Sequence, residues 1–127
     1  MGWSYADRGR ARVLAGQPAL AAADLRRARE LWAKRPKSDV DTRIEPARVL
    51  ALLAGLGRDA KSGVTAAEAA ACADQAVATL RDAISAGWAR REELKEPEFD
   101  SLRGREDFQK LVAELEAKSR PKAEPKA

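Results

Sequence analysis

The segment of this sequence that most resembles a chemical motif is a glycine-rich run, Gly55-Leu56-Gly57-Arg58-Asp59-Ala60-Lys61-Ser62. The run matches a phosphate-binding loop except that Ala60 stands where the second required glycine belongs, and it also fits a dinucleotide fingerprint. Both motifs need a strand before them and a helix after them, so that backbone amides surround the phosphate. The residues before Gly55 are typical of a helix, so we expect an ordinary loop between helices.

The side chains that most hydrolytic and metal chemistry requires are absent or isolated. The sequence has no histidine, which excludes Ser-His-Asp and Cys-His triads and histidine metal sites. Its single cysteine, Cys72, excludes an internal disulfide and lies on an apolar helical stripe, where we expect a buried, unreactive thiol. Neighbouring carboxylates, Glu92–Glu93 and Glu106–Asp107, are expected on solvated surface. The sequence therefore predicts a protein that is not an enzyme and has no cofactor or metal.

Arg8, Arg10 and Arg12 form the densest basic cluster of the chain. Arg8 and Arg12 are one helical turn apart and share a face, whereas Arg10 points elsewhere. The cluster is consistent with recognition of an acidic peptide segment. The simpler alternative, a solvated helix face, is favoured because surface charge alone is weak evidence of a site.

The composition indicates that helices must position these residues. The chain has 127 residues, of which 45% are hydrophobic, 35% charged and 5% aromatic, and it is rich in alanine. Such a composition favours an all-α fold, since strands draw on β-branched and aromatic residues. Apolar periodicity, glycine and proline breaks and a Thr65–Glu68 capping box predict helices over residues 3–14, 19–34, 45–56, 65–87, 89–94, 98–103 and 105–118.

These helices predict one domain over residues 1–118, with hairpins at 3–35 and 45–87 and closing helices at 89–118. The helix at 45–56 is apolar on most sides and is expected to be the most buried element. Residues 119–127 form a basic tail without periodicity, which we expect to be disordered. We expect the closing helix to cap the end of the domain with one apolar face, formed by Phe108, Leu111, Val112 and Leu115.

Charge and hydropathy indicate which compartment and which class of partner to expect for the protein. No apolar run is long enough for a transmembrane helix, and the first residues lack the features of a signal peptide, so a cytoplasmic protein without membrane contact is expected. The net charge of +4 comes from a basic beginning, an acidic middle and a basic end. A nucleic-acid binder more often shows a continuous basic stripe, so nucleic acid is the less favoured partner.

The first hairpin resembles one tetratricopeptide repeat. Its small, bulky and turn residues stand in the order that this motif requires, at Tyr5, Gly9, Gly16, Ala21, Leu25, Ala28 and Leu31. Arg8 and Arg12 depart from the motif, because the family prefers apolar residues there. A wider resemblance covers residues 3–117 and is similar to the terminal repeats of bacterial serine/threonine protein kinases with C-terminal tetratricopeptide arrays. It rests on Arg8-Gly9-Arg10-Ala11, Ala22-Ala23-Asp24-Leu25, Ala86-Gly87-Trp88 and Asp100 to Gln109.

The resemblance implies stacked helical hairpins, a terminal fragment of a larger array without the kinase domain, and a non-catalytic protein-interaction module. The first helix of each hairpin in such arrays lines a concave groove, which implies a partner-binding surface at Tyr5, Arg10, Arg12 and Val13. The expected partner is a protein or peptide segment of acidic character, and a basic helical nucleic-acid-binding domain is the alternative. Self-association through the uncapped N-terminal hairpin is also expected, because open ends of helical stacks expose apolar faces.

Overall fold

Every regular element of the computed structural model is a helix over the residues that it describes, 2–34, 44–88 and 91–119. This arrangement confirms the predicted all-α fold. The connector at 36–41 and residues 120–127 of the predicted tail lie outside the described residues, whereas Ser119 ends the last helix. With η for 3-10 helices, the elements are α1 (Gly2–Leu14), α2 (Pro18–Ala33), α3 (Glu45–Leu56), η2 (Ala60–Ser62), α4 (Ala66–Ser85), η3 (Arg91–Lys95), η4 (Pro97–Leu102) and α5 (Glu106–Ser119).

Local sequence explains where the long helices begin and end. Gly16 follows α1 with a φ of +75°, a left-handed conformation that favours glycine, and Pro18 occupies the first turn of α2. The Thr65 side chain accepts a hydrogen bond from the Glu68 backbone N–H at 3.0 Å, which confirms the predicted cap of α4. The Glu68 carboxylate does not close the capping box as expected. It accepts two hydrogen bonds from Arg26 of α2, at 2.7 and 2.9 Å, and so joins the two hairpins.

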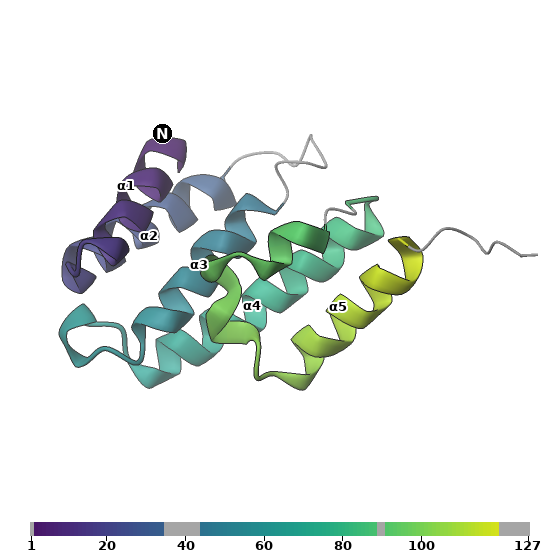
Figure 1. The fold of residues 1–127 in the computed structure, drawn as a ribbon. Coiled ribbons are helices and arrows are strands. Elements are labelled where there is room, and N and C mark those ends of the chain that lie inside the picture. The colour runs from purple at the N-terminus through teal and green to yellow at the C-terminus, as the bar shows by residue number, and fades with distance from the viewer. Residues whose placement is uncertain (1, 35–43, 89–90, 120–127) are drawn as a thin grey trace, which may run out of the picture.

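The helices pack in chain order, α1 against α2, α2 against α3 and α3 against α4, with α5 lying along α4 (Figure 1). Helix α3 also contacts η4, so neighbours surround it on several sides. Its apolar residues are accordingly buried around most of its circumference, which confirms that it is the most buried helix, as predicted. The core therefore runs along α3, and η4 covers the side of α3 that the other helices leave open.

The C-terminal segment closes this core as the sequence predicts. Phe108, Leu111 and Leu115 of α5 are buried, and Val112 is half-buried against them. Phe99 of η4 is fully buried, and its ring stacks on Phe108 with the ring centroids 6.3 Å apart. The contacts of Trp32 and Trp88 are likewise internal, because both side chains are buried. Aromatic packing thus attaches η4 and α5 to the helical hairpins.

Gly57→Ala is expected to lower the free energy of unfolding by about 1–3 kcal/mol through overpacking. Gly57 caps α3 with a φ of −61°, which alanine adopts without strain, so the cost is steric. A β-carbon at this position would overlap the β-carbon of Ala69 in α4 and lie 3.3 Å from the carbonyl oxygen of Ala54. Urea unfolding of Gly57→Ala, Ala69→Gly and the double variant measures the effect.

The double variant serves as the control, because Ala69→Gly removes the methyl group that the new β-carbon would meet. Ala69→Gly alone loses about 1 kcal/mol of helix propensity. The double variant should be less destabilised than the sum of the two single variants, since the two changes share one contact. Additive losses would contradict the steric explanation.

Candidate functional site

Arg12, one of the predicted groove residues, is bound within the first hairpin. It donates to Asp24 of α2 at 2.9 Å, and Arg8 donates to the same carboxylate at 2.8 and 3.0 Å. The Asp24 side chain is 5% exposed, and the guanidinium groups of Arg8 and Arg12 hold its pKa below the usual range. Since a buried carboxylate needs such partners, Arg8 and Arg12 fix α1 on α2. Arg8 is still largely exposed, as expected for a solvated face, whereas Arg12 is half-buried.

This arrangement also explains why Arg8 and Arg12 depart from the apolar preference of the resembled motif. Asp24 is itself a polar residue on the buried side of α2, at helical spacing between Ala21 and Ala28. A carboxylate on an apolar stripe is the one sequence signal that could have identified the partner of the two arginines.

Tyr5, the second predicted groove residue, is half-buried and packs against the core. The guanidinium carbons of Arg8 and Arg27 lie 5.5 and 5.9 Å from its ring centroid, within cation–π distance. These contacts connect Tyr5 to the side of the hairpin that carries Asp24, and Tyr5 does not line the pocket described below.

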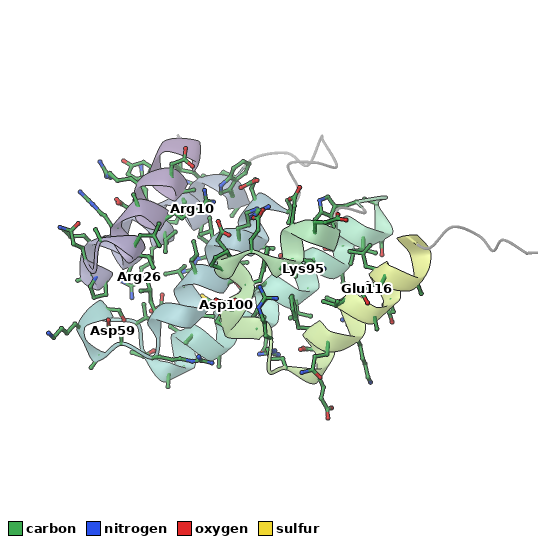
Figure 2. The ribbon with its side chains drawn as sticks, in the orientation of Figure 1. Arg10, Arg26, Asp59, Lys95, Asp100 and Glu116 are labelled. Atoms are coloured by element: carbon green, nitrogen blue, oxygen red, sulfur yellow. The ribbon has the colours of Figure 1, made fainter. Side chains whose placement is uncertain are left out.

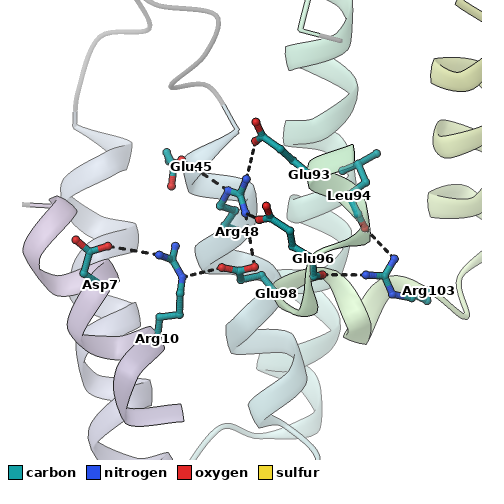
Figure 3. A network of polar contacts seen from close by, with 9 residues as sticks. All are labelled: Asp7, Arg10, Glu45, Arg48, Glu93, Leu94, Glu96, Glu98 and Arg103. Carbon is teal, nitrogen blue, oxygen red and sulfur yellow. Dashed lines mark hydrogen bonds and ion pairs between the residues drawn. The ribbon is translucent and has the colours of Figure 1, made fainter. Parts of the chain in front are cut away.

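Arg10 and Val13, the remaining predicted groove residues, face the rest of the molecule. Arg10 forms an ion pair with Glu98 of η4 at 2.8 Å and a longer one with Asp7 at 3.4 Å (Figure 3). Val13 lines a pocket together with Glu98. The structure thus places one predicted groove residue in a pocket and a second at its edge, and it directs Tyr5 and Arg12 elsewhere.

The pocket has a volume of about 470 Å³ and lies between the α1–α2 turn, α3 and η4; we call it the α1–α3–η4 pocket. Ser101 of η4 donates to the Ala51 carbonyl oxygen at 2.7 Å and holds η4 on α3 beside the pocket. Figure 2 labels two of the lining residues, Asp59 in the loop after α3 and Asp100 in η4. The pocket is lined by Val13, Gly16, Pro18, Ala51, Leu52, Gly55, Leu56, Arg58, Asp59, Lys61, Pro97, Glu98, Asp100 and Ser101.

Two of the lining carboxylates are neutralised by arginines outside the pocket. Glu98 pairs with Arg10 at 2.8 Å and lies 3.6 Å from Arg48, and Asp100 pairs with Arg103 at 2.8 Å. The third, Asp59, accepts the Lys61 backbone N–H at 2.9 Å and caps η2. Ion pairing therefore reduces the negative charge of the η4 side of the pocket.

Arg48 is the centre of a buried ion-pair network that sequence analysis missed (Figure 3). Its side chain is 9% exposed, and it pairs with Glu93 of η3 at 2.6 Å and, more closely still, with Glu96. Glu45 and Glu98 each lie 3.6 Å from the same guanidinium group. Burial raises the pKa of Glu45 above its ordinary value, although Arg48 opposes the shift. The network attaches η3 and η4 to α3.

The expectation that Glu92 and Glu93 form solvated surface is wrong for Glu93, because it is half-buried against Arg48. The available signal was Arg48 itself, a lone charged residue within an otherwise apolar run of α3. A buried arginine needs carboxylate partners, but periodicity does not say which of the many glutamates supply them.

The glycine-rich run does not have the structure that phosphate-binding loops require. Its first residues belong to α3, and no strand precedes it within the described ranges. Ser62 is buried, donates to the Leu56 carbonyl oxygen at 2.7 Å and accepts the Val64 N–H at 3.0 Å. These bonds close a loop between helices, as the sequence predicts.

Cys72 is fully buried, as expected, and Arg29 donates to its sulfur at 3.3 Å. Burial raises the pKa of the thiol, so thiolate chemistry is disfavoured at this position. Among residues 2–34, 44–88 and 91–119, no group of three or more acidic or cysteine side chains is arranged to hold a metal ion. In the same part of the chain, no helix combines the length and the apolar composition needed to cross a bilayer.

Comparison with known proteins gives no relative from which a function could be transferred. No protein-family model matches the chain, and no curated protein or solved structure matches it. The pocket and its surrounding contacts are therefore the basis for a functional proposal.

Proposed function

We propose that this chain is a non-catalytic protein-interaction module that binds a segment of another protein in the α1–α3–η4 pocket. The observation that carries the proposal is the pocket itself, whose volume of about 470 Å³ is sufficient for one or more side chains of a bound segment. Its lining combines apolar side chains, such as Val13 and Leu52, with small residues that leave room, such as Ala51 and Gly55.

The resemblance to tetratricopeptide repeats supports the same surface. The first helix of each hairpin lines the groove in that family, and here α1 and α3 both contribute to the pocket. By this resemblance, we propose that the module is the terminal part of a larger repeat array of the kind found in kinase-associated proteins. Residues 3–117 carry that likeness.

The alternative of a basic nucleic-acid-binding domain has less support from the described contacts. Phosphate binding needs cations that are free to replace counterions. Arg8, Arg12, Arg26, Arg48 and Arg105 are instead paired with carboxylates of this chain. Binding of phosphate by these five arginines would therefore compete with their internal ion pairs.

A displayed library of random 12-residue peptides, selected against the full chain, tests the proposal. We expect selected peptides to bind, and Val13→Glu to weaken their binding by about tenfold or more, because a carboxylate would replace part of the apolar lining of the pocket. Fluorescence anisotropy of labelled peptides measures the dissociation constants. A duplex DNA probe in the same assay should show no comparable affinity at about 0.15 M salt.

Two further variants make the outcome independent of the stability of Val13→Glu. Gly55→Ala adds a methyl group whose β-carbon would make ordinary contact with Ser101 at 3.5 Å, so the fold should tolerate it. We expect it to reduce binding by about tenfold, the effect of one misplaced methyl group in an apolar pocket. Ala78→Glu, on the exposed side of α4, is the control and should leave binding unchanged. Binding that is insensitive to both pocket variants would refute the proposal, as would the selection of no peptide.

A further inference from the structure

The pocket carries two cations that form no ion pair within the described part of the chain. Arg58 and Lys61 line the pocket from the loop after α3, and their exposed side chains form no ion pair with any described residue. Asp59 lies between them in sequence, so the loop holds two cations against one carboxylate. Two other arginines near the pocket, Arg10 and Arg103, differ in this respect because each is paired with a carboxylate of η4.

The unpaired charge of the pocket is therefore distributed unevenly between its two sides. On the η4 side, Glu98 and Asp100 already have arginine partners, so they offer little attraction to a cationic ligand. On the side of the α3 loop, Arg58 and Lys61 are available for new ion pairs. Electrostatic complementarity at an interface favours a ligand with carboxylates at this end.

The lining near these cations is apolar. Val13, Pro18 and Leu56 contribute apolar surface to the pocket. An apolar side chain of a bound segment would therefore meet apolar surface in this part of the pocket.

We infer that the pocket takes a protein segment with an apolar side chain for the pocket and neighbouring carboxylates that pair with Arg58 and Lys61. This inference rests on the proposed function and gives the chemistry of the partner. It also moves the recognition of acidic residues from Arg10 and Arg12, where the sequence placed it, to the loop after α3. The reason is that Arg10 and Arg12 are bound to Glu98 and Asp24.

Three displayed libraries of 12-residue peptides distinguish the possible partners. Each combines the same apolar residues with one polar class, namely aspartate and glutamate, asparagine and glutamine, or lysine and arginine. We expect the acidic library to yield the tightest pocket-dependent binders, and their affinity should fall as sodium chloride is raised, because exposed ion pairs are screened by salt. The binders are then measured by fluorescence anisotropy as synthetic labelled peptides.

The double variant Arg58→Ala/Lys61→Ala should weaken an acidic binder by about tenfold, the loss expected for two exposed ion pairs. It should also reduce the salt dependence of binding. Arg81→Ala/Lys110→Ala is the matched control, since it removes the same charge from exposed positions of α4 and α5 outside the pocket. We expect less than about a twofold effect there.

The outcomes separate this inference from the proposed function. Pocket-dependent binders that come equally from the neutral or basic library, or that ignore Arg58 and Lys61, overturn the inference and leave the proposed function standing. Equal losses in the two double variants also overturn it, because net charge would then explain the binding. If no library yields a binder that is sensitive to Val13→Glu or Gly55→Ala, the proposed function itself fails.

Discussion

Phe99→Ala is expected to lower the free energy of unfolding by about 3–5 kcal/mol, the usual cost of truncating a buried phenylalanine. Phe99 is fully buried, stacks on Phe108 of α5, and has the Arg48 guanidinium carbon 5.6 Å from its ring centroid. Alanine would leave a cavity between η4, α3 and α5 that none of these elements can fill alone. Equilibrium urea unfolding, followed by circular dichroism, measures the loss.

The same substitution should weaken peptide binding. Phe99 is flanked by η4 residues that line the α1–α3–η4 pocket, namely Pro97, Glu98, Asp100 and Ser101. The position of this side of the pocket therefore depends on the packing of Phe99. Leu14→Ala is the control for stability, because its side chain is 84% exposed and its loss should change the free energy of unfolding by less than about 0.5 kcal/mol. Similar unfolding midpoints for the two variants would show that η4 is not held by Phe99.

Arg48→Ala is the second variant with a large expected effect, a loss of about 3 kcal/mol or more at neutral pH. Arg48 is the shared partner of Glu45, Glu93, Glu96 and Glu98, and its removal leaves these carboxylates close together, although Glu98 keeps its ion pair with Arg10. Breaking a buried pair from one side costs more than the pair itself contributes, because the remaining charge stays desolvated. Urea unfolding again measures the difference.

The pH dependence of this loss tests its electrostatic cause. Burial raises the pKa of Glu45 above its ordinary value, Arg48 opposes this shift, and the neighbouring Glu93 adds to it. Without Arg48 the folded-state pKa of Glu45 should rise further above its unfolded value, so that stability is gained below this pKa and lost as the pH rises through it. Arg48→Ala should therefore be closer to the wild type at about pH 5 than at about pH 7.5.

Arg58→Ala is the matched control for Arg48→Ala, because Arg58 is an exposed arginine without an ion pair in the described structure. Its effect on stability should stay within about 0.5 kcal/mol at both pH values. A loss for Arg48→Ala that is the same at both pH values would indicate that the packing of its side chain, rather than its charge, stabilises the fold.

Much of the helical framework follows from short-range sequence signals. Gly16 and Pro18 set the turn between α1 and α2, Thr65 sets the start of α4, and the spacing of Phe108, Leu111 and Leu115 gives the buried face of α5. These signals suffice because caps and helical periodicity act within a few residues of the chain. The 3-10 helix η2 was not predicted, since three residues are too few for a periodic pattern.

The candidate site was predictable only in part. Of the expected groove residues, Val13 lines the α1–α3–η4 pocket, and Arg10 reaches the edge of it through Glu98. Arg12 and Tyr5 were expected there as well, but the partners that hold them, Asp24 and a pair of arginines, lie on both helices of the hairpin. Helical periodicity gives the direction of a side chain and not the group that it meets.

Composition, helix caps and apolar spacing are enough to predict an all-α chain, the burial of Cys72 and the order of the helices along the sequence. The absence of histidine excludes catalysis by that side chain. Tertiary structure alone decides which charges are bound and which remain free. Arg48 meets Glu93 and Glu96, 45 and 48 residues away, whereas Arg58 and Lys61 line a pocket and form no ion pair with residues 2–34, 44–88 or 91–119. The physical reason is that a helix boundary depends on neighbours in sequence, but an ion pair depends on the distance between groups that only packing brings together.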